Sequence, residues 1–280
     1  MNKYALDPDL HYELKQAIEG LTYLTNAMAF RSVGSTNDYA LLLEKDHLLG
    51  GTIIMAAEQT SGRGRLGRTW HMQKGDIAMS LLLRAPNLPR NQALLPMMPA
   101  LSIVRSLGAL AIPVRLKWPN DVIVPKVSEA PVNYFGSFRK VGGVLVENVF
   151  RDGEMSASVI GIGLNVVKNP ALQKQIPHAA SLGDLSPGVD RGRVLKNLLP
   201  ALNQIIGACR LKENENAILR EYENHCETLG SLVSFASPEQ TITGRATRLN
   251  ADGSLTIHDG VTDHIVYAGD INLVQKRWSE

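Results

Sequence analysis

The stretch VGGVLVENVFRDGEMSASVIGIGLNV, residues 141–166, decides the fold class. Two runs rich in branched residues, 141–149 and 157–166, flank the hairpin-type turn signal RDGE at 151–154. A direct hairpin can join only antiparallel strands, so the sheet is at least mixed. We therefore expect an α+β fold with a mixed, largely antiparallel sheet packed with helices. The segment GIGLN is then no dinucleotide-binding fingerprint.

Outward from this hairpin, hydrophobic periodicity predicts the remaining elements. Strands are expected at 51–57, 77–83 and 115–118, and helices at 7–19, 91–110 and 191–227. Pro96 and Pro99 lead us to expect the second helix to begin firmly only after Met98. The third should be interrupted at Pro200 and again at the polar run 212–216, and FRSVGSTND at 30–38 should be a loop.

The texture of the chain changes after Gly230. Short alternating segments follow, separated by the turn signals Asp252-Gly253 and Asp259-Gly260. They predict a small all-β domain, a barrel of the SH3 kind. A chain of 280 residues suits one large core with a smaller addition, so we expect domains at 1–228 and 229–280.

Composition excludes several classes of protein. The formal charge of +2 and the 5% aromatic content argue against a general nucleic-acid binder. The start has no export signal and no apolar run reaches about 18 residues, so we expect a cytoplasmic protein without a membrane segment. Cys209 and Cys226 lack metal-ligand spacing and are expected to be buried free thiols.

The segment GRGRLGRTW, residues 62–70, is the clearest candidate for chemistry. Its glycines and arginines alternate: Gly62, Arg63, Gly64, Arg65, Gly67 and Arg68. Glycines let backbone amides form a concave nest, and guanidinium groups add forked donors around it. Such a loop can hold a phosphate or a carboxylate. Taken alone, such a stretch is more often a solvated basic loop or an RNA-contacting segment.

Four further motifs accompany the loop: SVGSTND at 32–38, KWPNDV at 117–122, RKVGGVLVE at 139–147 and GIGLNV at 161–166. With AAEQTSGRGRLGRTW at 56–70 they make the chain resemble the biotin protein ligase family, whose members also end in a small β-domain. The resemblance implies a ligase that joins biotin and ATP, with Mg²⁺, into biotinyl-5′-adenylate and pyrophosphate. It then implies transfer of biotin to a lysine of a biotin carboxyl carrier protein.

This reaction brings two anions together, so cations must neutralise them. By resemblance, Arg63 and Arg65 belong to the loop that closes over bound biotin and adenylate, and Lys140 lies beside the reacting groups. With Lys117 and Asp121, Arg65 and Lys140 form the expected catalytic set. Asp121 either helps to deprotonate the incoming lysine or binds magnesium. The sequence does not choose between these two roles.

The neutral ring of biotin needs a few hydrogen-bond partners in an apolar wall. By resemblance these are Ser35, Thr36 and Gln59, while Gly142 and Gly143 allow close approach of the backbone to the ligand. The Ser-Thr-Asn run is also a common helix cap.

The resemblance places further residues around the ligands: Asn37, Gly62, Gly64, Arg68, Trp70, Asn120 and Asn165. Trp70 is a candidate for stacking on adenine, whereas Trp118 is expected in the core. Asn165 is also a common type of turn residue.

Departures from the family pattern leave alternatives open. Leu66 stands where a further basic residue is common, and 18 residues between Asp121 and Lys140 predict a surface excursion. Only about 30 residues precede the Ser-Thr-Asn motif, so we expect no DNA-binding domain.

A lipoate protein ligase and a non-catalytic biotin sensor are the alternative functions. The oligomeric state is open, a homodimer included.

Overall fold

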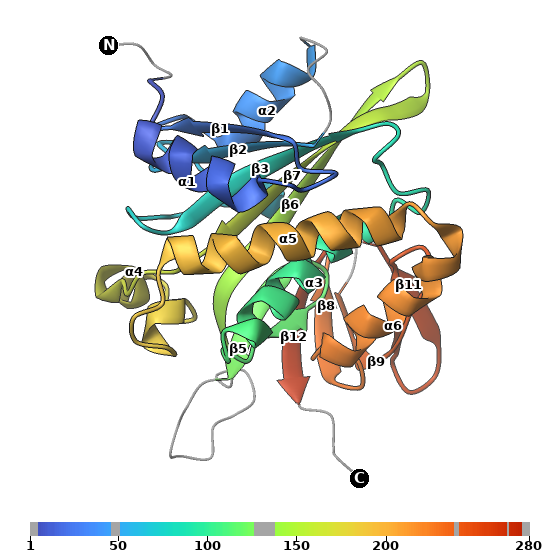
Figure 1. Ribbon diagram of the computed structural model, residues 1–280. Helices are drawn as coiled ribbons and strands as arrows, with labels where there is room; N and C mark the ends of the chain where they lie inside the picture. The colour runs from blue at the N-terminus through green and yellow to red at the C-terminus, as the bar shows by residue number, and fades with distance from the viewer. Residues whose placement is uncertain (1–4, 46–50, 126–137, 238–240, 268, 276–280) are drawn as a thin grey trace.

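A seven-stranded mixed sheet organises the computed structural model, which describes residues 5–45, 51–125, 138–237, 241–267 and 269–275 (Figure 1). The strand order is β1-β2-β3-β7-β6-β5-β4, and the β1–β2 pair is parallel while the others are antiparallel. The strands are β1 (Asn26–Phe30), β2 (Thr52–Ala56), β3 (Ile77–Arg84), β4 (Arg115–Lys117), β5 (Asp121–Pro125), β6 (Phe138–Arg151) and β7 (Glu154–Leu164). The predicted mixed, largely antiparallel sheet is confirmed.

The β6–β7 hairpin is the longest pair in this sheet. Arg151 pairs with Glu154, and the two residues between them, Asp152 and Gly153, have φ angles of 51° and 82°. Positive φ at both central positions is the mark of a type I′ turn, whose twist matches that of the flanking strands. The turn expected from RDGE is therefore confirmed.

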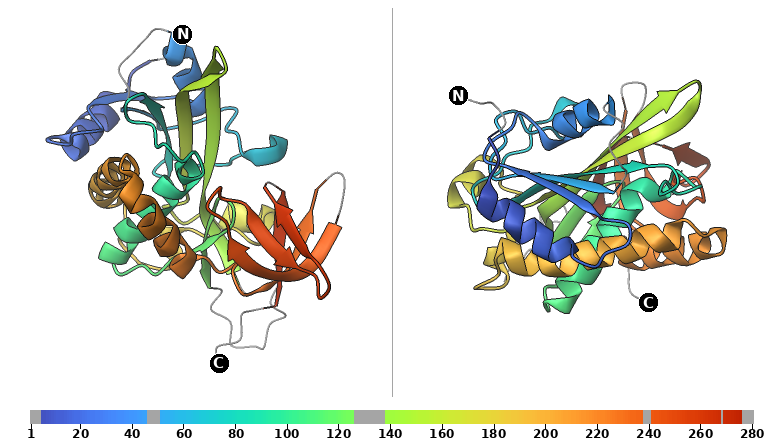
Figure 2. Two further views of the ribbon diagram at one scale, coloured as in Figure 1. Left: turned by 90° about the vertical axis from the view of Figure 1, so that its right-hand side faces the viewer. Right: turned by 45° about the horizontal axis from the view of Figure 1, so that its top comes forward.

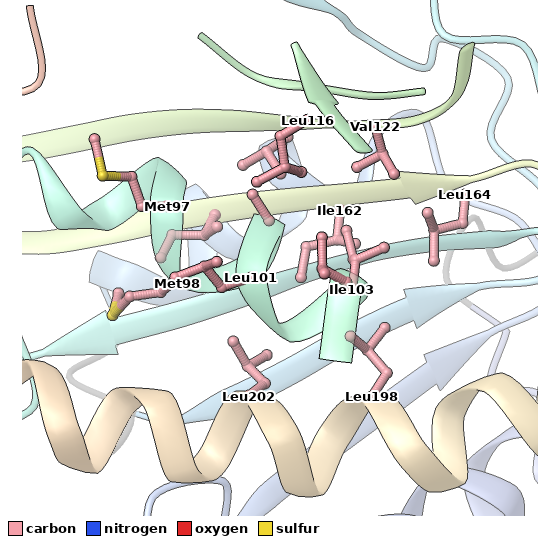
Figure 3. Packing of buried hydrophobic residues seen from close by; sticks show 14 of the residues in the cluster. Met97, Met98, Leu101, Ile103, Leu116, Val122, Ile162, Leu164, Leu198 and Leu202 are labelled. Atoms are coloured by element: carbon pink, nitrogen blue, oxygen red, sulfur yellow. The ribbon is translucent and has the colours of Figure 1, made fainter. Parts of the chain in front are cut away.

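Helices cover both faces of the sheet. The helices are α1 (Pro8–Ile18), α2 (Thr36–Lys45), α3 (Leu94–Ala109), α4 (Pro170–Gln175), α5 (Arg191–Cys209) and α6 (Glu215–His225). The helices α1, α3 and α5 pack on one face, where Leu101, Ile103, Ile162 and Leu198 meet in the main core (Figure 3). Helix α2 packs on the other face with a smaller cluster that includes Leu82.

Two expectations about proline were wrong. Helix α3 begins at Leu94 rather than after Met98, because Pro96 lies in the first turn, where backbone N–H groups have no partner inside the helix. Pro99 lies inside the helix, whose almost complete burial offsets the missing hydrogen bond. Helix α5 likewise continues through Pro200, because buried leucines before and after it pack against α3. The break at 212–216 is confirmed by the end of α5 and the start of α6.

The segment 30–38, expected as a loop, contains regular structure at both ends. Strand β1 ends at Phe30, and helix α2 begins at Thr36, inside the Ser-Thr-Asn motif. The excursion predicted between Asp121 and Lys140 lies largely outside the described residues. Trp118 is 2% exposed and Cys209 and Cys226 are buried free thiols, as predicted.

A five-stranded antiparallel sheet follows, with the order β11-β10-β9-β8-β12. Its strands are β8 (Leu232–Ala236), β9 (Thr241–Leu249), β10 (Leu255–His258), β11 (Asp263–Val266) and β12 (Asp270–Gln275). This sheet lies to one side of the β6–β7 hairpin (Figure 2, left). The described strands form an open order with two edges, so the expected SH3-like barrel is not confirmed. In the described ranges, no helix is long and apolar enough to span a membrane.

Candidate active site

A cavity of about 320 Å³ opens on the face of the sheet that carries α2. Gly161 and Gly163 of β7 and Gly143 of β6 line it. A β-carbon at Gly161 would lie 2.5 Å from Oδ1 of Asn37, and one at Gly163 would lie 2.5 Å from the ring of Trp70. The glycines of GIGLN therefore make room for two side chains that line the cavity.

The structure brings together nearly all the site residues predicted from the sequence. Those that line the cavity are Ser35, Thr36, Asn37, Gln59, Arg63, Gly64, Arg65, Arg68, Trp70, Lys117, Asn120, Asp121, Lys140, Gly143 and Asn165. Gly62 and Gly142 are not in the lining. Gly62 closes the base of the arginine loop, since its carbonyl accepts a hydrogen bond from the Trp70 amide at 2.9 Å. A β-carbon at Gly142 would lie 2.4 Å from Cδ2 of Leu164, so the close approach there is to strand β7.

The side of the cavity next to β3 is a hydroxyl–amide cluster, formed by Thr36, Asn37, Gln59 and Ser80. The amide and hydroxyl of Thr36 donate to Oε1 of Gln59 at 2.8 and 3.1 Å. Oε1 of Gln59 accepts both bonds, which fixes the orientation of this side-chain amide and leaves Nε2 as its hydrogen-bond donor. The Ser80 hydroxyl lies 2.7 Å from that of Thr36 and 2.6 Å from Oδ1 of Asn37. The cluster carries no charge, which suits a neutral polar group of a ligand.

On the side next to β5 lies a lysine–aspartate cluster, formed by Lys117, Asp121 and Lys140. Nζ of Lys140 lies 2.6 Å from Oδ1 of Asp121, and Nζ of Lys117 lies 3.4 Å from Oδ2. Burial alone would raise the pKa of Asp121, but the two lysines outweigh it and hold this pKa below its ordinary value. With two cations for one anion, the cluster can accept further negative charge.

A β-bulge aims Lys140 into the cavity. Val122 pairs with Gly142 and Ile123 pairs with Lys140, so strand β6 has one unpaired residue, Val141. An extra residue reverses the alternation of side chains along a strand. Lys140 therefore lies on the same face as Gly143, although without the bulge the two would lie on opposite faces.

The arginine loop, residues 62–70, folds back on itself as a short hairpin. The Gly64 amide donates to the Arg68 carbonyl at 2.7 Å, and Arg63 pairs with Thr69 in an antiparallel bridge. Leu66 and Gly67 at the tip have φ angles of 54° and 72°. The Leu66 side chain is 68% exposed. The tip thus points the apolar side chain outward.

Each arginine of this loop contacts a different part of the molecule. Arg63 forms ion pairs with Asp38 at 2.6 Å and with Glu147 at 2.8 Å. Arg68 forms an ion pair with Asp270 of β12.

Arg65 is held differently from the other two arginines. It donates to Oδ1 of Asn120 at 2.8 Å, a neutral acceptor. Burial lowers the pKa of Arg65, an effect that the nearby Asp121 and Asp270 oppose. Among the described residues, the Arg65 guanidinium has only an amide as its hydrogen-bond partner and is partly desolvated, so it is the arginine best placed to take a ligand anion.

Two buried polar atoms in the lining have no partner among the described residues, Nε1 of Trp70 and Oδ1 of Asn165. The Asn165 side chain donates from Nδ2 to the Ala180 carbonyl at 3.0 Å, and its Oδ1 is buried without a donor among the described residues. Buried polar atoms are rarely unpaired in native proteins. A bound ligand with polar groups would satisfy both.

Sequence reasoning missed four contributors to the site: Ser80, Glu147, Gly161 and Asp270. Glu147 accepts from Asn37 at 2.7 Å as well as from Arg63, so it links α2 to the arginine loop. It ends the motif RKVGGVLVE, and the alternation along β6 and β7 would have placed Glu147 and Gly161 on the cavity face. No local pattern marks Ser80 or Asp270.

Metal and thiol chemistry have little support in the described part of the chain. It holds no group of three or more His, Cys, Asp or Glu side chains that could bind a metal ion. Burial raises the pKa of the Cys209 thiol to about 12, so this thiol is a poor nucleophile.

Comparison with known proteins places this geometry in a class. The model of the Biotin/lipoate A/B protein ligase family matches residues 29–165, the part that runs from the end of β1 through β7 and includes α2, α3 and the arginine loop. The class of protein is therefore a ligase domain of the biotin and lipoate type.

Individual relatives narrow this class. The chain is 31% identical over 248 residues to the biotin–[acetyl-CoA-carboxylase] ligase of Mycobacterium tuberculosis, covering 85% of each chain. It is 33% identical over 174 residues to the enzyme of the same name from Paracoccus denitrificans, covering 60% of this chain and 67% of that one. A solved biotin protein ligase from Aquifex aeolicus, in complex with biotin and ATP, superposes with a TM-score of 0.71 at 28% identity, covering 90% of this chain and 100% of that one. The chain belongs to the biotin protein ligase family and is a ligase.

Proposed function

We propose that the protein binds biotin and ATP in this cavity, forms biotinyl-5′-adenylate with release of pyrophosphate, and then biotinylates a lysine of a biotin carboxyl carrier protein. One observation carries the proposal: a single cavity joins a neutral hydroxyl–amide cluster to a cationic lysine–aspartate cluster under the arginine loop. The first suits the ureido ring of biotin, and the second suits its carboxylate and the phosphates of ATP. Residues 1–228 would form the catalytic domain, and 229–280 would contribute Asp270.

In the first half-reaction, a carboxylate oxygen of biotin attacks the α-phosphorus of ATP. The bond from that phosphorus to the bridging oxygen breaks, and pyrophosphate leaves. Negative charge gathers at both ends of this transfer, so Lys140 and Arg65 act by holding fixed positive charge beside it. Lys117 adds a second ammonium group within 3.4 Å of Asp121.

In the second half-reaction, the deprotonated amine of the acceptor lysine attacks the carbonyl carbon of biotinyl-5′-adenylate. The bond from that carbon to the phosphate oxygen breaks, AMP leaves, and the nitrogen gives up one proton as the amide forms. A general base works best when its pKa is near the operating pH. The pKa of Asp121 is held below its ordinary value by two lysines, so we assign this residue to positioning Lys140 and Lys117 rather than to proton removal. Both of its oxygens are paired, so it does not fit a magnesium ion held by the protein. Magnesium would enter with the phosphates of ATP.

The test is pyrophosphate release from the purified full chain with ATP, magnesium and either biotin or lipoate. We expect pyrophosphate release with biotin but not with lipoate. A streptavidin-detectable adduct should follow when a carrier domain is added. A carrier domain whose acceptor lysine is changed to arginine is the matched control and should stay unmodified. Release with lipoate alone would favour a lipoate ligase, and binding of biotin without release would favour a sensor.

A further inference from the structure

The ion pair between Arg68 and Asp270 is the contact by which the five-stranded sheet reaches the arginine loop. Asp270 starts β12 and lines the cavity next to Gly269 and Ile271. Its side chain is 38% exposed, and that of Arg68 is 65% exposed. A carboxylate thus stands inside a cavity whose other charges near the loop are mainly positive.

This position is at odds with a cavity that must hold a polyphosphate. A triphosphate next to a fixed carboxylate is repelled, and a guanidinium engaged by that carboxylate is not available to a phosphate oxygen. Arg65 differs, because a phosphate has to displace only the neutral amide of Asn120. For Arg68 a phosphate has to displace a full negative charge.

We propose that Asp270 is an internal counter-ion for the arginine loop: it holds Arg68 while no phosphate is present and releases it when a polyphosphate enters. This rests on the proposed use of ATP in the same cavity. Asp270 is thereby a positioning residue that acts through Arg68. In the free enzyme Asp270 keeps the loop folded against the cavity. When a phosphate replaces the Asp270 carboxylate beside Arg68, the guanidinium still has an anion as its partner.

The contacts within the loop make this exchange feasible. The hairpin is closed by its own backbone bonds, Gly64 to Arg68 at 2.7 Å and Trp70 to Gly62 at 2.9 Å. Arg63 is tied separately to Asp38 and Glu147. Release of the Arg68 side chain from Asp270 therefore leaves these backbone bonds of the loop in place.

The experiment compares the full chain with Asp270→Asn and uses inorganic tripolyphosphate as the probe. We expect hydrogen exchange of the amides in 62–70 to become about two- to fivefold faster in the ligand-free variant, the range for loss of a partly exposed ion pair. We expect the affinity for tripolyphosphate, measured by calorimetry, to rise by about the same factor. Unchanged loop exchange, or an affinity that is equal or lower, would overturn the proposal.

Two further variants show whether Asp270 acts through Arg68. Asp263→Asn removes another acid of the same sheet, one paired with His258 at 2.9 Å, and should change neither measurement. In an Arg68→Ala background, Asp270→Asn should have no further effect on loop exchange. An effect of the same size in that background would show a role that does not pass through Arg68 and would also overturn the proposal. None of these readouts needs biotin or turnover, so a failed ligase assay would leave them interpretable.

Discussion

The two sides of the cavity solve different physical problems with different chemistry. The hydroxyl–amide cluster next to β3 is neutral, buried at Thr36, Asn37 and Ser80 and half-buried at Gln59, and held by hydrogen bonds of 2.6–3.1 Å. The lysine–aspartate cluster next to β5 is charged and partly exposed, with Lys140 at 38%. Fixed dipoles can recognise a neutral ring, because burying them removes little hydration. Anions that react with each other need full positive charge beside them.

This difference teaches that affinity and rate are separable in the same cavity. Substitutions next to β3 should act mainly on the binding of biotin, and those next to β5 mainly on the transfer step. Strand β7 runs between the two clusters, since it pairs with β3 on one side and β6 on the other. Its two cavity-facing glycines therefore give matched positions for the comparison.

The largest expected effect is that of Lys140→Ala. Removing one preorganised cation from beside a developing charge should slow pyrophosphate release by about 10²–10³-fold, while biotin still binds. Single-turnover release of pyrophosphate and calorimetric binding of biotin measure the two effects. Lys196→Ala, on the exposed side of α5, is the control and should match the unmodified chain. A normal rate for Lys140→Ala would remove this residue from the transfer step.

Next in size is the matched pair Gly161→Ala and Gly163→Ala. A methyl group at 161 displaces Asn37 and should weaken biotin binding about tenfold, equivalent to one lost buried hydrogen bond. A methyl group at 163 displaces the Trp70 ring, whose centroid lies 5.9 Å from Nζ of Lys140, and should slow adenylate formation by a similar factor. Gly108→Ala in α3 meets no atom within 4 Å and is the control. Equal effects of both variants on biotin affinity would break the separation of the two sides.

A smaller effect is expected for the stability of Asp121→Asn. The pKa of Asp121 is below its ordinary value of 3.8, so the folded state favours the carboxylate. The resulting stabilisation is fully present above the unfolded-state pKa and is lost as the pH falls through the lower folded-state pKa. Urea unfolding should give a deficit of about 1–2 kcal/mol for the variant at pH 7 and pH 5. The deficit should shrink below about pH 4; a deficit that vanished between pH 7 and pH 5 would contradict the ion-pair assignment.

The smallest effect is expected for Leu66→Arg at the tip of the arginine loop. Leu66 belongs to neither cluster and is 68% exposed. The free energy of unfolding should change by less than about 0.5 kcal/mol, and the affinity for ATP by less than about fivefold. Thermal unfolding and the KM for ATP check this. A change above tenfold would show that the tip reaches the phosphates and so belongs to the charged side.

A feature of the fold could be predicted from the sequence where its signal lies in residues that are neighbours in the chain. The β6–β7 hairpin was predicted because branched residues and a two-residue turn are neighbours in the chain. Strand β1, NAMAF, was missed because it has few branched residues and pairs in parallel with β2 through a long connection. Strand β5 was missed because it is only five residues long and its first two residues, Asp121 and Val122, belong to the motif KWPNDV.

The site residues divide in the same way into those with a local sequence signal and those without one. Most lining residues lie in five linear motifs, so the sequence could predict them together. The partners of these residues could not be predicted, because Glu147 and Asp270 acquire their roles from arginines 84 and 202 positions away. The expected start of α3 after Met98 and the expected break at Pro200 failed for a related reason, since packing between α3 and α5 outweighs the local cost of proline.

Val141 of β6, the residue that β5 leaves unpaired, makes strand register, rather than residue identity, the determinant of where the reactive ammonium group points. If Val141 were paired in the ladder and the bulge lost, Lys140 would lie three residues before Gly143 in strict alternation and would face the layer of α3 and α5 among apolar side chains. The hairpin turn at Asp152 and Gly153 would be untouched. A chain of this fold could thus lose its chemistry through a one-residue change of register that leaves every motif residue in place.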